Sequence, residues 1–196
     1  LKMSTRLYFF DVKFTSLHAW IEVPGTVINY AVVQSATDDL FYINHAVDKS
    51  YFSGGSIFSQ RYNTTTFQDS MTVLYGHNSR SQAMFAQLNN FADASFFEQN
   101  QSIYIYTPEK VYEYQIFAAY PHSSDHLLLC NDFNDPEQFA AYFDSLADGV
   151  NCNYRRDLFP QFGDKVLTLS TCYRQNRTQR FLVQGVLTQE YTVLKK

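Results

Sequence analysis

KVLTLST, residues Lys165 to Thr171, and RFLVQGVL, residues Arg180 to Leu187, are two apolar stretches separated by a short polar connection. Both are rich in β-branched and large apolar residues, which suit the half-buried surface of a sheet. We therefore predict two consecutive strands. Cys172 follows the first strand directly, and Arg180 opens the second.

Further strands are predicted upstream of this pair, at Thr26 to Gln34, Met71 to Tyr75, Ser102 to Thr107 and Val111 to Ala119. The last two alternate with period two and are joined by Thr107-Pro108-Glu109-Lys110. Because Pro at the second position favours a tight turn, this pair should form a hairpin.

Two connections carry helical patterns. Met84, Phe85, Leu88 and Phe91 recur at helical spacing, with Ser79 or Ser81 as the expected cap. The second helix should begin with Asp135 as cap, Pro136 at the first position and Gln138 completing a capping-box pattern, and should stop near Gly149. Its apolar face consists of Phe139, Tyr142, Phe143 and Leu146.

Composition narrows the class of protein. The 196 residues suggest one domain, 45% are apolar, and the 17% of aromatic residues favour strands. Six or more strands with only two helices indicate a mainly β protein with a closed or nearly closed barrel, because a parallel α/β sheet needs more helices. The net charge of −4 argues against nucleic-acid binding as the main function.

The residues that could take part in catalysis lie at the ends of predicted strands. A thiol fixed at the end of a strand suits a nucleophile, and Cys172 is followed by Arg174, Arg177 and Arg180, whose charges would favour a thiolate. His77, in Tyr75-Gly76-His77-Asn78, also follows an apolar strand. Taken singly, such residues usually have no catalytic role, because most are buried thiols or solvated charges. Only their arrangement along the chain is informative.

That arrangement resembles the sortases, cysteine transpeptidases of Gram-positive cell surfaces, and more narrowly class B. The matching stretches are Trp20 to Thr26, Ile28 to Gln34, Tyr75 to Asn78, Thr168 to Cys172 and Arg180 to Val183, in the family's order. The helix from Pro136 to Leu146 resembles the helical connection typical of class B. The resemblance implies a closed eight-stranded β-barrel.

The resemblance also implies site residues. Cys172 would be the nucleophile, His77 the acid and base, and Arg180 the donor to the substrate and the oxyanion. Arg177 competes for that last role, and Arg180 is preferred because it directly precedes the apolar strand. Candidates for the substrate groove are Asn29, Val33, Tyr75, Leu127, Ser170 and Thr171.

Substrates and location follow from the same resemblance. The enzyme would cleave an LPxTG-like or NPxTx-like sorting motif of a secreted protein and transfer that protein to an amine of a peptidoglycan precursor or a pilin lysine. Residues 1–19 would follow an upstream membrane anchor and residues 20–196 would form the catalytic domain, on the extracellular face of the membrane. Alternatives are a cysteine protease with water as acceptor and, ranked last, a non-catalytic binding barrel.

No cofactor or metal is expected. The histidines at 18, 45, 122 and 126 lack a ligand pattern with an acidic partner, and no calcium-binding loop is present. The cysteines form no CxxC pair, so either all three are reduced or Cys130 pairs with Cys152 and leaves Cys172 free.

Overall fold

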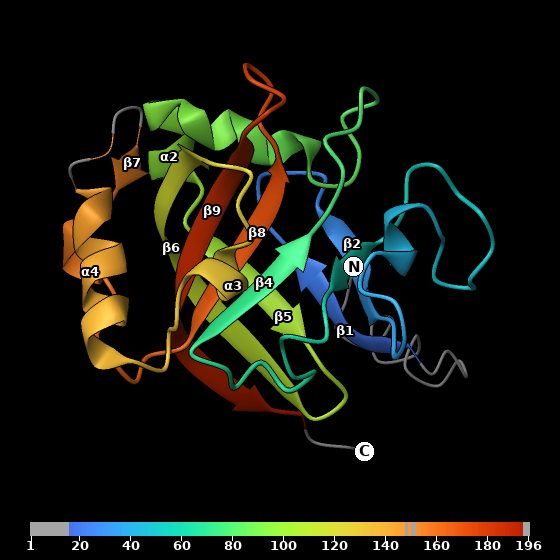
Figure 1. Cartoon of the computed structure of the whole chain (residues 1–196), viewed down its shortest axis with the longest axis horizontal. Helices are drawn as coiled ribbons and strands as arrows, with labels where there is room; N and C mark the ends of the chain where they lie inside the picture. The colour runs from blue at the N-terminus through green and yellow to red at the C-terminus, as the bar shows by residue number, and fades with distance from the viewer. Residues whose placement is uncertain (1–15, 148, 150–151, 194–196) are drawn as a thin grey trace.

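Eight strands close into a barrel in the computed structural model, which describes residues 16–147, 149 and 152–193 (Figure 1). They are β1 (Leu17–Glu22), β2 (Asn29–Gln34), β3 (Ile57–Ser59), β4 (Met71–Tyr75), β5 (Ser102–Tyr106), β6 (Lys110–His122), β8 (Val166–Cys172) and β9 (Arg180–Thr192). The order around the barrel is β5-β1-β2-β3-β4-β8-β9-β6, and pairing of β5 with β6 closes it. The expected mainly β, closed eight-stranded fold is confirmed.

Two strand pairs in the ring are parallel, β2 with β3 and β4 with β8, and the others are antiparallel. A short strand, β7 (Asn153–Tyr154), pairs with β6 outside the ring. Residues 1–15 of the expected N-terminal segment 1–19 lie outside the described residues, and β1 already begins at Leu17.

The predicted strands form, with shifted ends. The hairpin turn is confirmed, since the backbone N–H of Thr107 donates to the carbonyl of Lys110 at 2.8 Å. β2 starts at Asn29 rather than Thr26, because Thr26 belongs to a turn in which Gly25 has a φ of +80°. β1 and β3 were not predicted, since β3 has only three residues and β1 mixes polar with apolar side chains.

Helices occupy the connections. They are the 3-10 helices η1 (Phe41–Ile43), η2 (Ala86–Ala92) and η3 (Arg156–Leu158), and the α-helices α2 (Ala94–Gln99), α3 (Leu127–Cys130) and α4 (Pro136–Leu146). α4 begins as expected, with the Asp135 carboxylate accepting from the N–H of Gln138 at 2.8 Å. Gln138 does not complete a capping box, because its side chain accepts from the N–H of Asp132 instead.

The predicted helix from Met84 to Phe91 forms only in part, as the 3-10 helix η2. Met84 has a φ of +53°, which no helix allows, and its N–H donates to the Tyr30 hydroxyl. The segment becomes η2, without a side-chain cap, while the hydroxyls of Ser79 and Ser81 bond to each other. The true α-helix, α2, begins after Asp93, whose carboxylate accepts from the N–H of Phe96.

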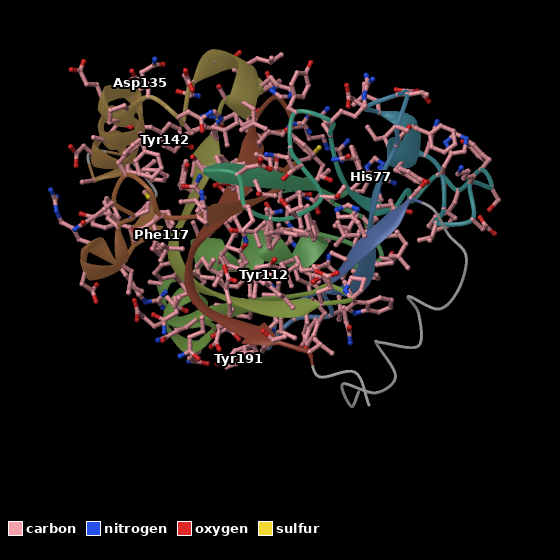
Figure 2. The ribbon with its side chains drawn as sticks, turned by 90° about the horizontal axis from the view of Figure 1, so that it is seen from below. His77, Tyr112, Phe117, Asp135, Tyr142 and Tyr191 are labelled. Carbon is pink, nitrogen blue, oxygen red and sulfur yellow. The ribbon has the colours of Figure 1, made fainter. Side chains whose placement is uncertain are left out.

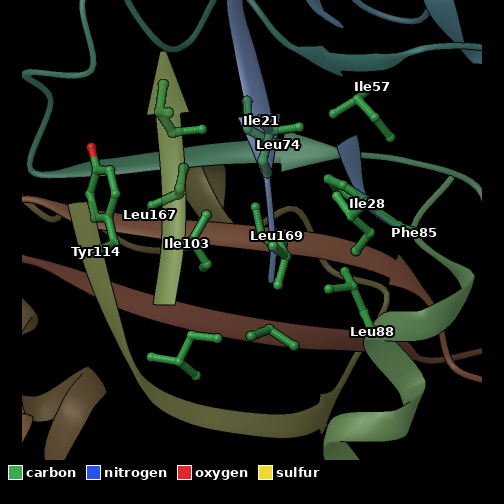
Figure 3. Packing of buried hydrophobic residues seen from close by; sticks show 14 of the residues in the cluster. Ile21, Ile28, Ile57, Leu74, Phe85, Leu88, Ile103, Tyr114, Leu167 and Leu169 are labelled. Atoms are coloured by element: carbon green, nitrogen blue, oxygen red, sulfur yellow. The ribbon is translucent and has the colours of Figure 1, made fainter. Parts of the chain in front are cut away.

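Apolar side chains fill the barrel interior and a second layer outside it. Figure 3 shows the interior, where Ile21, Leu74 and Leu169 from three different strands meet. The second layer seals α4 to the barrel wall, through Phe139 and Phe143 of the helix packed with Phe117 of β6. Figure 2 shows His77 well separated from α4, so the helix supports the barrel without forming the site around this histidine.

A buried polar chain also ties α4 to the barrel. The Tyr120 hydroxyl lies 2.5 Å from the Tyr142 hydroxyl of α4 and donates to Oε1 of Gln184 at 3.0 Å. Nε2 of Gln184 in turn donates to Oγ1 of Thr168 at 2.9 Å. Gln184 and Thr168 have no exposed surface, so these bonds satisfy polar groups that burial would otherwise leave unpaired.

Candidate active site

The parallel pair β4 and β8 places two chain segments at the same end of the barrel. Tyr75 lies opposite Ser170, and beyond the ladder the N–H of Gly76 donates to the carbonyl of Ser170 at 3.2 Å. Oγ1 of Thr171 donates to the carbonyl of Gly76 at 2.8 Å. His77 and Cys172 therefore follow two segments that are fixed to each other.

Gly76 is required because the chain passes very close to Ile57 and Phe85 at this position. A Cβ at this position would lie 2.5 Å from Cδ1 of Ile57 and 2.7 Å from Cγ of Phe85. Both side chains are buried in the barrel core and have little room to retreat. A glycine before the histidine thus lets the chain leave β4 over the packed core.

Arg180 is brought to Cys172 by the antiparallel pair β8 and β9. The two residues are direct partners in the register, and Nη1 of Arg180 donates to Sγ of Cys172 at 3.1 Å. This contact fixes the sulfur beside a positively charged N–H donor.

The backbone at Cys172 is held from the other side by side-chain amides. Nδ2 of Asn78 donates to the Cys172 carbonyl at 2.9 Å, and Nδ2 of Asn89 donates to the same oxygen at 3.3 Å. Oδ1 of Asn89 accepts from the N–H of Arg174 at 2.7 Å. Asn78 belongs to the motif around His77, whereas no pattern in the sequence singles out Asn89.

His77 is oriented by a backbone atom rather than by a carboxylate. Its Nε2 lies 2.6 Å from the carbonyl oxygen of Ile43, at the end of η1. A carbonyl oxygen can only accept, so Nε2 carries a proton, and in the neutral ring the free lone pair is on Nδ1. Nδ1 is therefore the ring nitrogen left to accept a proton.

These groups line a cavity of about 240 Å³. Its walls include His77, Cys172 and Arg180, and four of the residues expected in the substrate groove, namely Tyr75, Leu127, Ser170 and Thr171. The other lining residues are Leu40, Ile43, Phe58, Gln60, Val73, Gly76, His122, Ser124, Asp125, His126 and Leu182. The cavity suits an extended peptide segment with apolar and polar side chains.

Asn29 and Val33 are placed elsewhere. Oδ1 of Asn29 accepts from the indole N–H of Trp20 at 2.6 Å, and Val33 is fully buried beside Tyr42 and Phe58. Neither residue lines the cavity.

One wall carries Gln60 and His126, which the sequence did not single out for binding. Nε2 of His126 lies 2.6 Å from Oε1 of Gln60, and the imidazole stands edge-on to the ring of Tyr62. Tyr75 stacks on Phe58, and burial raises the pKa of Tyr75 to about 12, so its phenol stays neutral at physiological pH.

Within the described residues, no group of three or more His, Cys, Asp and Glu side chains is placed to hold a metal ion. No helix among them is long and apolar enough to cross a membrane. Cys130, Cys152 and Cys172 are all free thiols in the structure.

A barrel with a cysteine, a histidine and an arginine at one end defines a class of cysteine acyl-transfer enzymes. The family model described as "Sortase domain" matches residues 21–188, most of the chain. The chain therefore belongs to the sortase family and is a sortase cysteine transpeptidase.

Relatives place it beside class B. Sortase B of Listeria monocytogenes is 29% identical over 86% of this chain and 68% of its own length. Sortase B of Staphylococcus aureus is 29% identical over 78% of this chain and 62% of its own length, so the chain spans about two thirds of these curated relatives.

Solved structures agree. Sortase B of Clostridium perfringens superposes with a TM-score of 0.81 and 29% identity, covering 95% of this chain and 100% of that one. A Streptococcus pyogenes class B sortase involved in pilus biogenesis gives 0.81 and 26%, over 95% and 100%. A Staphylococcus aureus sortase B–substrate complex gives 0.81 and 26%, over 94% and 86%.

Proposed function

We propose that this chain cleaves a sorting motif of the LPxTG or NPxTx kind with Cys172 as the nucleophile, His77 as the acid and base, and Arg180 as the donor to the substrate. The observation that carries the proposal is the 3.1 Å contact between Arg180 and the thiol, beside a cavity that also holds His77. The Staphylococcus aureus relative was solved as a sortase B–substrate complex, which supports substrate binding by this chain.

The first half-reaction forms a thioacyl-enzyme. Sγ of Cys172 attacks the carbonyl carbon of the motif's Thr, and the guanidinium of Arg180 donates to the oxygen that gains negative charge. Nδ1 of His77 takes the proton of the Cys172 thiol and gives it to the departing amine, so the C–N bond breaks and a thioester remains. Because Arg180 has five N–H donors, it can serve both the sulfur and the carbonyl.

The second half-reaction transfers the acyl group to an amine of the cell wall. His77 takes the proton of the incoming amine, and Cys172 is released. We place the working enzyme on the extracellular face of a Gram-positive membrane, where such acceptors occur.

Mass spectrometry of the purified chain with peptides of both motifs tests this proposal. We expect a covalent adduct on Cys172 that equals the acyl part of one peptide, and an amide product when triglycine is added. An amide product separates a transpeptidase from a cysteine protease, which would give only the carboxylic acid. Absence of any adduct and of cleavage would favour a binding barrel and overturn the proposal.

A pilin lysine is the second candidate acceptor, because the similar Streptococcus pyogenes class B sortase is involved in pilus biogenesis. Transfer to a lysine-containing peptide, compared with transfer to triglycine under the same conditions, distinguishes the two roles.

A further inference from the structure

A second cavity, of about 500 Å³, opens at Cys172 from another direction. It is lined by Asn78, Ser79, Arg80, Gln82, Tyr173, Arg174 and Arg177 together with Cys172. Cys172 is the one residue that this cavity shares with the 240 Å³ cavity. Cys172 therefore lies between two cavities with different lining residues. The proposed acyl transfer uses only the 240 Å³ cavity.

The second cavity is positively charged. Three of its lining residues are arginines and none is acidic, although the chain as a whole carries a net charge of −4. Arg80 and Arg177 are exposed, and neither side chain forms a hydrogen bond or ion pair with the part of the chain that the structure describes. Two guanidinium groups are thus available to an anion from outside.

Hydrogen bonds and ring stacking fix the cavity wall around Arg174 and Arg177. Nη2 of Arg174 donates to Oε1 of Gln82 at 3.2 Å and to the carbonyl of Ala86 at 3.1 Å. Tyr173 stacks on Phe181 of β9, and its N–H donates to the carbonyl of Gln179 at 3.0 Å. Arg177 lies within the connection that this bond closes.

We propose that this arginine cavity, lined by Arg80, Arg174 and Arg177, binds the amine acceptor, and that the acceptor carries an anionic group, a carboxylate or a phosphate, near its amine. This inference rests on the proposed function. The acyl part of the thioester occupies the 240 Å³ cavity, so an amine that reaches the same carbonyl carbon must come from another side. The arginine cavity provides a second approach to Cys172.

The amine nitrogen forms a bond to the thioester carbonyl carbon, the C–S bond breaks, and its electron pair returns to Cys172. The proton of the amine passes to Nδ1 of His77. The arginines take no part in bond making. They hold the anion of the acceptor by charge-assisted hydrogen bonds, for which the planar guanidinium is well suited.

The test compares amines that differ in charge. The acyl donor is a sorting-motif peptide with a neutral, amidated leaving segment, so that the donor does not compete for the arginines. The acceptors are triglycine, its uncharged amide triglycinamide, and 2-aminoethyl phosphate. The variants are Arg177→Gln, Arg80→Gln and the double variant, with Arg156→Gln as control, because Arg156 is exposed in η3 and lines neither cavity.

We expect the wild type to have a lower acceptor KM for triglycine than for triglycinamide. Because exposed charge pairs contribute little each, each single variant should raise the KM for triglycine by about threefold, which equals about 0.7 kcal/mol, and the double variant by about tenfold. The KM for triglycinamide should stay the same in each variant, and Arg156→Gln should have no effect. High salt should remove the advantage of triglycine. A larger advantage for 2-aminoethyl phosphate would identify phosphate as the preferred anion.

Failure of the proposed function and failure of the acceptor assignment give different results in these assays. If the wild type does not cleave the peptide or form an adduct on Cys172, the proposed function fails. If cleavage occurs but the charged and neutral amines are used equally well, or the arginine variants change all KM values alike, or no amine is used at all, the acceptor assignment is overturned while the cysteine chemistry stands.

Discussion

Nη1 of Arg180 lies 3.1 Å from Sγ of Cys172, and the two residues are direct partners across the antiparallel strands β8 and β9. Side chains alternate between the two faces of a sheet, so a slip of one residue would turn Arg180 away from the thiol. The neighbouring pairs, Thr171 with Phe181 and Ser170 with Leu182, are buried and hold this register. The position of the arginine is therefore fixed by the barrel.

Replacing Arg180 with lysine should lower turnover by about 10²-fold or more, the scale for the loss of one oxyanion donor. A lysine keeps the charge but has no planar fork to serve the sulfur and a substrate carbonyl together. Steady-state cleavage of one sorting-motif peptide measures the effect, and Arg156→Lys is the matched control. A larger loss for Arg177→Lys than for Arg180→Lys would assign the donor role to Arg177.

Cys172→Ala and His77→Ala should each abolish cleavage and transfer without unfolding the protein. Both positions are partly exposed at strand ends, so truncation opens no core cavity and should change the free energy of unfolding by less than about 1 kcal/mol. Peptide cleavage and thermal unfolding measure the two effects. The control is Cys130→Ala, at an exposed thiol. Residual cleavage by Cys172→Ala above background would contradict the nucleophile assignment.

Continuous apolar runs made most of the barrel predictable. β4, β8 and β9 are long or strongly apolar, so their existence follows from local sequence, and Asp135 with Pro136 marked the start of α4. The segment after Met84 shows the limit. Its apolar spacing matches a helix, but the contact of Met84 with Tyr30, 54 positions away, favours a left-handed turn that no local pattern encodes.

The candidate site, like the fold, could be predicted only in part from the sequence. Residue types and spacing pointed to His77 and Cys172, the family resemblance selected Arg180 among three arginines, and the structure places all three residues around one cavity. The partner of His77 could not have been found in this way, because it is the backbone carbonyl of Ile43 and carries no signature in its side chain. The arginine cavity likewise depends on how the segment around Arg80 folds beside the β8–β9 connection.

Cys152 should react with iodoacetamide far more slowly than an ordinary thiol. Burial raises the pKa of Cys152 to about 11 from the reference value of 9.0, which lowers its thiolate fraction at neutral pH by about 10²-fold. Mass spectrometry of timed alkylation should show Cys130, which is exposed, modified first of these two. A Cys130–Cys152 disulfide in unreduced protein would contradict both the structure and this order.

Tyr142→Phe should lower the free energy of unfolding by about 1–2 kcal/mol, the scale for one buried hydrogen-bonded hydroxyl. The variant leaves the hydroxyl of Tyr120 without the partner from α4 that lies 2.5 Å away. Urea unfolding measures the loss, and Tyr154→Phe, at a partly exposed tyrosine of β7, is the control. Peptide cleavage should stay within about twofold of the wild type, because Tyr142 lines neither cavity. Equal stability of both variants would show that the buried polar chain does not anchor α4.

His18 should make the protein less stable in mild acid. The side chain stacks on Phe67 and its Nε2 lies 3.5 Å from the Ser59 hydroxyl, and burial lowers the pKa of His18 from 6.5 to about 4. Between these two values the unfolded chain binds a proton that the folded chain does not, so stability falls as the pH falls. Above pH 6.5 His18 is neutral in both states and the protein keeps its full free energy of unfolding. At pH 4 the titration of His18 lowers that free energy by about 3 kcal/mol.

Urea unfolding of wild type and His18→Gln between pH 7 and pH 4 isolates this contribution from those of the carboxylates. Glutamine cannot titrate, so the difference in unfolding free energy between the two proteins should change with pH in favour of the variant, by about 3 kcal/mol at pH 4. His45→Gln is the control, since that imidazole is only half-buried beside Phe41 and its Nδ1 bonds to the Phe41 carbonyl. A difference between wild type and His18→Gln that is independent of pH would mean that His18 is protonated inside the fold, and the burial argument would then be wrong.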